Sequence, residues 1–233
     1  MTIEFKRLIY DGNYYLNHSE TVNEDLTMCV EIDDDCFKNC FDLKEIQIPN
    51  SITKIGDKCF YDCSNLTKID IPNSITKIGD KCFYDCSNLT KIDIPNSVKK
   101  LGDYCFKNCK NLTKIIIPNS VTKICEGCFD GCSNLKEIIM PNLISRLAYG
   151  CFSDCSNLLS INIPSSVTEI GYACFYKCSN LSSIIIPNSV TKIHEYCFAH
   201  CLNLEEITIP NSVSKIGKGC FNDCPSLLKI NQH

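Results

Sequence analysis

The chain has 233 residues, of which 44% are hydrophobic, and its formal net charge is -4 at pH 7. This composition is ordinary for a folded protein, and the small excess of acid gives no general attraction to nucleic acid or to an anionic membrane. We expect no transmembrane segment, because no apolar run approaches the roughly 18 residues that a spanning helix needs.

Residues 1–31 do not follow the pattern of the rest of the chain. Phe5–Leu16 consists of two apolar stretches on either side of Asp11-Gly12, a dipeptide typical of hairpin turns. We expect residues 1–31 to form an N-terminal cap with a β-hairpin, because a repeat array must cover its first open core face. The first residues carry charge and lack an apolar stretch, so we expect no signal peptide and a cytoplasmic protein.

Residues 32–233 are built on a period of 23 residues. Ile48–Asp70 reads IPNSITKIGDKCFYDCSNLTKID, and Ile71–Asp93 repeats it letter for letter. Cys-Phe pairs recur at the same interval and begin at residues 36, 59, 82, 105, 128, 151, 174, 197 and 220. A fixed period in this range with recurring Leu and Ile predicts a leucine-rich solenoid. We expect one right-handed arc of about nine repeats.

Each repeat has three predicted parts. Ile69 and Ile71 alternate with polar residues, which predicts a strand on the concave face, and Pro72 ends it. About nine such strands would form one parallel sheet. The segment Ile75–Ile78 predicts an extended stretch on the convex side. We expect Asp80–Cys86 to form a short 3₁₀ or helical return turn with its cysteines and phenylalanine in the core.

The chain contains 20 cysteines, and all but Cys29 and Cys125 occupy the two positions of a repeated C-F-x-x-C motif. Cysteine at a repeating core position packs like a small apolar residue, so we expect two ladders of buried, reduced thiols. Structural disulfides and a thiol-rich metal or redox-buffering protein are the alternatives. A zinc site would require His194 and His200 to approach the cysteines of their own repeat.

The repeat L-x-x-I-x-I-P-x-x-[VI]-x-x-I-x-x-x-C-F-x-x-C resembles the BspA-like class of leucine-rich repeats, which typically has Ala-Phe where this chain has Cys-Phe. Members of that class are often bacterial or protist surface proteins implicated in adhesion to host or matrix proteins. The resemblance implies a protein-binding role and transfers no fixed functional residues. A cell-surface adhesin, exported by an unconventional route, is therefore an alternative to a cytoplasmic scaffold.

The outward positions of the concave strands are the candidate binding surface. Most are polar, but unpaired apolar side chains interrupt them, and such side chains on a solvated sheet indicate a contact surface; plain β-propensity is the alternative reason for them. The candidate partner-binding residues are Lys68, Asp70, Lys91, Asp93, Lys114, Ile116, Glu137, Ile139, Leu159, Asn162 and Ile185.

The sequence predicts a non-enzymatic protein-interaction scaffold without a cofactor or a resident metal. No glycine-rich phosphate loop or nucleophile elbow is present, and no Ser–His–Asp set has a reason to converge. We expect a protein partner and no nucleic acid. The chain stops within a repeat, and Ile230 aligns with a core position, which predicts an end-to-end homodimer through the C-terminal repeat or a chain cut from a longer one.

Overall fold

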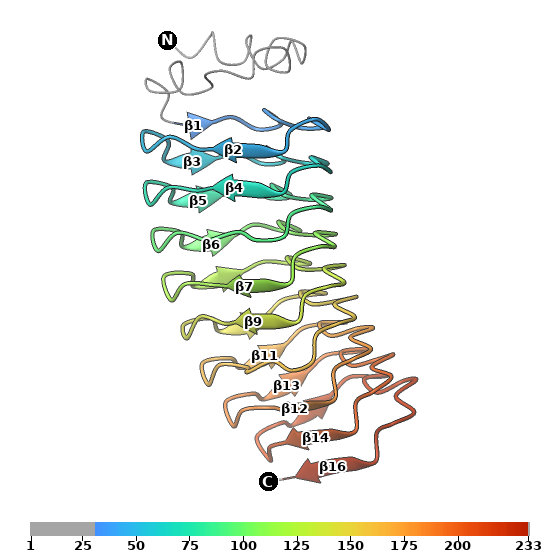
Figure 1. Ribbon diagram of the computed structural model, residues 1–233. Coiled ribbons are helices and arrows are strands. Elements are labelled where there is room, and N and C mark those ends of the chain that lie inside the picture. The colour runs from blue at the N-terminus through green and yellow to red at the C-terminus, as the bar shows by residue number, and fades with distance from the viewer. Residues whose placement is uncertain (1–30, 233) are drawn as a thin grey trace.

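The computed structural model describes residues 31–232 as a solenoid of stacked coils, one for each 23-residue repeat (Figure 1). All strand pairs are parallel, and each residue lies beside the residue 23 positions further along, as Ile46 does with Ile69. The predicted repeat solenoid is therefore confirmed. The hairpin expected at Phe5–Leu16 lies outside the described residues, as does the rest of the predicted cap except Glu31.

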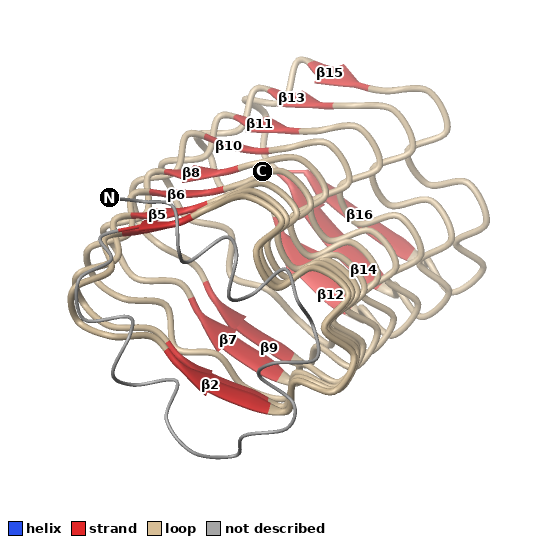
Figure 2. Cartoon of the chain, turned by 90° about the horizontal axis from the view of Figure 1, so that it is seen from above, coloured by secondary structure: helices blue, strands red, loops and turns tan. Residues whose placement is uncertain are grey.

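Two sets of short strands run along the stack, on different sides of each coil (Figure 2). The first set, which we call the first sheet face, is the one predicted to bind a partner. It contains β2 (Glu45–Gln47), β4 (Lys68–Asp70), β7 (Lys114–Ile116), β9 (Glu137–Ile139), β12 (Ser183–Ile185), β14 (Glu206–Ile209) and β16 (Lys229–Gln232).

The second sheet face consists mostly of two-residue Lys-Ile strands from the segment that follows each proline turn. It contains β1 (Glu31–Ile32), β3 (Lys54–Ile55), β5 (Lys77–Ile78), β6 (Lys100–Leu101), β8 (Lys123–Ile124), β10 (Arg146–Leu147), β11 (Glu169–Ile170), β13 (Lys192–Ile193) and β15 (Lys215–Ile216). In both sets an apolar residue at the centre or end of the strand faces the core, as Ile69 and Ile78 do, which is the alternation expected of a half-buried strand. At the open C-terminal end of the stack the equivalent residues, Ile216 and Ile230, are partly exposed.

Neither face is one uninterrupted sheet. The first face is divided into sheets β2-β4, β7-β9 and β12-β14-β16, and the second into β1-β3-β5-β6-β8 and β10-β11-β13-β15. The prediction of one sheet of about nine strands was therefore wrong. The core phenylalanines stack 5.0–5.8 Å apart along the whole column, across the breaks in the sheets as well as within them.

The return turns are hydrogen-bonded turns, and the prediction of a short 3₁₀ or helical segment there was wrong, because no helix occurs in residues 31–232. Lys81 and Asp85 have positive φ angles of 54° and 58°. These two left-handed residues direct the N–H groups of Lys81, Phe83 and Asp85 toward carbonyl oxygens of the next coil, at N–O distances of 2.7–2.8 Å. A helix would use those donors within its own coil.

A column of phenylalanine rings fills the centre of the stack. Phe60, Phe83 and Phe106 are fully buried, as are their equivalents as far as Phe198, and neighbouring rings lie within 13° of parallel. The two coils of identical sequence contain the most nearly parallel pair, Phe60 and Phe83, at 1°.

The second cysteine of each repeat bonds one coil to the next. The Sγ of Cys86 donates to the carbonyl oxygen of Phe60, 3.1 Å away, and the Sγ of Cys109 donates to that of Phe83, 3.2 Å away. The same Phe60 oxygen also accepts the N–H of Cys63 within its own turn, at 3.2 Å. The thiol therefore satisfies an oxygen that lies in the apolar core, which an alanine could not do.

Replacing a ring in the middle of the column should be costlier than replacing one near its end. Phe106→Ala removes a fully buried ring stacked on both sides, and we expect a loss of about 3–5 kcal/mol in the free energy of unfolding. Phe221→Ala, at a half-buried ring, should cost less than half as much. Urea denaturation followed by circular dichroism measures both. Equal losses would show that the column does not stabilise the stack as a unit.

Candidate functional site

The charged candidates of the first sheet face pair with one another. The Lys68 ammonium lies 3.1 Å from the carboxylate of Asp70 on the same strand. Lys91 and Asp93 form the same pair at 2.9 Å in the next coil. Across the β7–β9 ladder, the ammonium of Lys114 lies 2.9 Å from the carboxylate of Glu137. All six side chains are more than half exposed, so these pairs add little stability and leave the face without a net charge there.

The apolar candidates of the same face are strongly exposed. Ile116 and Ile139 are direct partners in the β7–β9 ladder, and they are 51% and 45% exposed. Ile185 on β12 is 72% exposed, and Leu159 is 55% exposed in the coil between β9 and β12. We call Ile116, Ile139, Leu159 and Ile185 the apolar stripe. Asn162, also exposed, occupies the position between Ile139 and Ile185 in the repeat.

The structure does not gather all eleven candidates into one place. Ile116, Ile139 and the Lys114–Glu137 pair lie together on the two strands β7 and β9. Lys68 and Asp70 lie on β4, in a separate sheet. Residues 91–93 and 160–162, which contain Lys91, Asp93 and Asn162, form no strand, although Ile92 and Ile161 between them stay in the core.

The thiols and imidazoles lie in different environments. Cys197 and Cys201 are fully buried, whereas His194 is 3.9 Å from carboxylates of Glu169 and Glu195, and His200 is 3.4 Å from that of Asp223. In residues 31–232 no three His, Cys, Asp or Glu side chains are placed to hold a metal ion together. The described cysteines are free thiols, and all but Cys36, Cys40 and Cys224 are buried.

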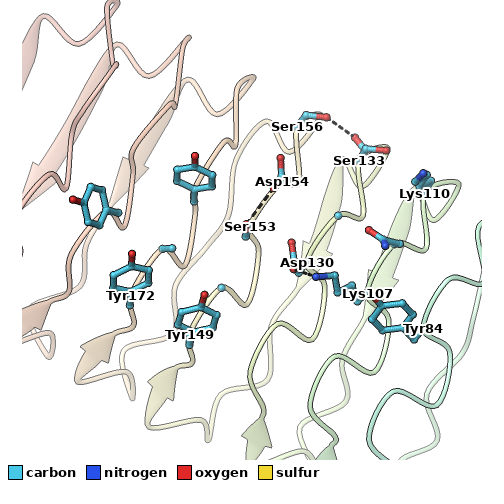
Figure 3. A pocket seen from close by; sticks show the side chains of 16 residues that line it. Tyr84, Lys107, Lys110, Asp130, Ser133, Tyr149, Ser153, Asp154, Ser156 and Tyr172 are labelled. Carbon is cyan, nitrogen blue, oxygen red and sulfur yellow. Dashed lines mark hydrogen bonds and ion pairs between the residues drawn. The ribbon is translucent and has the colours of Figure 1, made fainter. Parts of the chain in front are cut away.

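A hollow that the sequence did not predict lies on neither sheet face. It is an open depression of about 920 Å³ on the surface of the return turns (Figure 3). Tyr149 and Tyr172 stand side by side on one side of it, and Tyr84 lies beyond Lys107 on the other. We call this depression the tyrosine hollow. It is lined by Tyr84, Lys107, Asn108, Lys110, Asp130, Gly131, Ser133, Tyr149, Gly150, Ser153, Asp154, Ser156, Tyr172, Ala173, Tyr176 and Tyr196.

Small residues create the floor of the tyrosine hollow. Gly150 aligns with Lys58 and Lys81 in the repeat, and a Cβ added to it would touch only the Cβ of Ser153, 3.8 Å away. Ser153 in turn aligns with Tyr84. The sequence therefore contains the hollow as a departure from the repeat, in the form of small residues at positions where other coils have large side chains.

The repeats match the family profile described as BspA type leucine-rich repeat region, in six copies over residues 30–159 and 122–232. A comparison with curated proteins gives no match. Within residues 31–232 there is also no helix of the length and apolarity required to cross a membrane.

Several solved structures are similar. A leucine-rich repeat protein from Bacteroides ovatus is 31% identical with a TM-score of 0.79, and the match covers 87% of this chain and 58% of that one. The leucine-rich repeat protein of T. pallidum is 27% identical with a TM-score of 0.60, over 75% of this chain and 71% of that one. A leucine-rich repeat protein from Eubacterium ventriosum is 21% identical with a TM-score of 0.54, over 86% and 63% of the two chains, which shows a shared fold alone.

The buried thiols should make the protein unstable at alkaline pH. Burial raises the pKa of Cys63 and of Cys220 to about 12, and it raises the pKa of Cys82 well above its ordinary value. Below the ordinary thiol pKa, near 8.5, both the folded and unfolded chains are protonated. Above it only the unfolded chain ionises, so each such thiol should lower the free energy of unfolding by about 1.4 kcal/mol per pH unit.

We therefore expect a melting temperature that is level between about pH 6 and 8 and falls steeply above about pH 9. Thermal melts followed by circular dichroism measure it. Cys109→Ala, which removes one buried thiol, should make the decline of the unfolding free energy with pH shallower. A melting temperature unchanged at pH 10 would contradict the burial of the thiols.

Proposed function

Because the chain belongs to the BspA-type leucine-rich repeat family, we propose that it is a non-enzymatic scaffold that binds a protein partner on the first sheet face. The apolar stripe is the observation that carries this proposal. Ile116, Ile139 and Ile185 point into solvent from strands whose neighbouring side chains are otherwise polar. Exposed apolar side chains on a rigid sheet lose little conformational freedom when a partner covers them, and their burial is favourable.

The charge pairs beside the stripe suit the same function. Lys114 and Glu137 already satisfy each other, so a partner need not bring an opposite charge to bury the adjacent isoleucines. A partner with an apolar centre and a polar rim fits this arrangement, as in ordinary protein interfaces.

The proposal includes a cytoplasmic location and a protein partner. A cytoplasmic location is supported by the thiol hydrogen bonds, such as that from Cys109 to Phe83, because only a reduced thiol has the proton to donate. An adhesin for a host or matrix protein is the alternative that the family resemblance favours. Labelling of intact source cells with a membrane-impermeant reagent distinguishes the two locations.

Ile139→Lys should abolish partner binding while leaving the fold intact. The side chain is 45% exposed and lies at the centre of the apolar stripe, so the substitution places an ammonium group in the proposed contact. We expect at least a tenfold loss of affinity, equivalent to about 1.4 kcal/mol. Affinity capture from an extract of the source cell, followed by titration of the purified partner, measures the loss.

The matched control is Leu202→Lys in a turn that belongs to neither sheet face, where Leu202 is 46% exposed. It makes an equivalent chemical change at a similar exposure and should leave binding unchanged. A partner that is bound equally by wild type and by Ile139→Lys, or that is lost with Leu202→Lys alone, would contradict the assignment to the first sheet face.

Self-association through the last repeat stays a prediction from the sequence. In the structure Ile230 lies on β16 and is 48% exposed, beside the fully buried Ile207. If two copies meet there, light scattering at high concentration should give a dimer for wild type and a monomer for Ile230→Lys. A monomer in both samples would remove the proposed contact.

A further inference from the structure

We propose that the tyrosine hollow binds an extended, proline-rich peptide segment of a protein in the polyproline II conformation. This site lies on the return turns and shares no residue with the first sheet face. Binding at one site can therefore be tested without binding at the other. The length of the hollow, its charge, its free hydrogen-bond donors and its aromatic wall all suit such a segment.

The hollow is elongated along the stack. Its lining runs from Tyr84 to Tyr196, which are five coils apart, so it extends roughly 25 Å at about 5 Å per coil. The floor between these ends consists of small side chains, among them Gly131, Gly150 and Ala173. A long, shallow depression of this kind suits an extended chain better than a compact small molecule. Polyproline II rises 3.1 Å per residue, so about eight residues would cover it.

The charges of the hollow cancel. The Lys107 ammonium lies 2.8 Å from the carboxylate of Asp130, and this pair is less than one-third exposed. The lining contains one further cation, Lys110, and one further carboxylate, Asp154, which accepts the hydroxyl of Ser153 at 3.4 Å and lies 4.0 Å from the ammonium of Lys177. Neither a strongly acidic nor a strongly basic segment would be attracted, which favours an uncharged occupant.

The backbone of the return turns cannot pair with an added strand. The N–H groups of Phe106, Phe129 and Phe152 already donate to the next coil at 2.8–2.9 Å. The hydroxyls of Ser153 and Ser156 already donate within the protein. The donors that remain include the tyrosine hydroxyls and the ammonium group of Lys110, which can donate to carbonyl oxygens. Proline has no N–H to satisfy and a free carbonyl oxygen, so a proline-rich segment matches this supply of donors.

The aromatic wall supplies the apolar contact. Tyr149 and Tyr172 stack 5.4 Å apart and 9° from parallel, and they are 46% and 40% exposed. Tyr196 meets Tyr172 edge to face at 5.7 Å. Proline-rich segments dock on surfaces built from aromatic side chains, which offer a flat apolar ring with a polar hydroxyl at the rim (Figure 3).

Titration calorimetry of the full chain with acetylated, amidated decaproline tests the proposal. We expect saturable binding that is at least tenfold tighter than that of a neutral Gly-Ser peptide of equal length. Ser153→Tyr should weaken it at least tenfold by filling the floor. The fold should accept that ring, because Tyr61 and Tyr84 occupy the same repeat position in adjacent coils and stack at 4.7 Å. Asn222→Tyr makes the same kind of substitution at the same repeat position outside the hollow, and it should change binding less than twofold.

Tyr172→Ala is a second variant that removes part of the wall without adding bulk, and it should also weaken binding at least tenfold. It decides the matter if Ser153→Tyr proves misfolded by circular dichroism. Absence of decaproline binding, or equal affinity in wild type and Tyr172→Ala, would overturn the proposal. Maltohexaose is the saccharide probe, and tighter binding of that sugar than of decaproline would assign the hollow to glycans instead.

Discussion

The structure depends on bonding between neighbouring coils at the return turns. Every second amide of a turn, such as those of Lys81, Phe83 and Asp85, donates to the next coil and not to its own. This bonding holds the phenylalanine rings in register. The thiol of the second cysteine in a repeat adds a hydrogen bond to a phenylalanine carbonyl oxygen of the preceding coil, as Cys86 does with Phe60. Because all of these contacts join residues of adjacent repeats, one coil alone has almost nothing to hold it folded.

The fold could be predicted because its information is periodic. An interval of 23 residues with apolar side chains at fixed places sets both the parallel register and the composition of the core, and Ile69 and Ile78 lie where the alternation puts them. The form of the return turn could not be predicted in this way. It depends on the sign of φ at Lys81 and Asp85. Lysine gives no indication of a left-handed backbone, and aspartate, although enriched in that conformation, does not indicate it as strongly as glycine does. The breaks in the sheets could not be predicted either, because residues 91–93, which form no strand, repeat the sequence of β4 at residues 68–70.

Of the two candidate surfaces, the apolar stripe follows from the repeat and could be predicted, whereas the tyrosine hollow could not. The adjacency of Ile116 and Ile139 followed from the repeat, because residues 23 apart are neighbours wherever the ladder forms. The tyrosine hollow was missed because it arises where the repeat loses side chains, at Gly150 and Ser153, and because its two sides come from coils far apart in sequence. A sequence shows which groups are present more readily than it shows the space that their absence leaves.

The identical repeats at Ile48–Asp70 and Ile71–Asp93 make the length of this protein a variable quantity. A gene segment encoding one of them could be lost or copied by recombination, and the coils at the junction would still meet the neighbours they meet now. Such a change would lengthen or shorten the protein by one coil without disturbing Gly150, Ser153 or the apolar stripe, all of which lie further along. The first part of the array can therefore act as an adjustable spacer, whereas the apolar stripe and the floor of the tyrosine hollow lie in the irregular repeats beyond it.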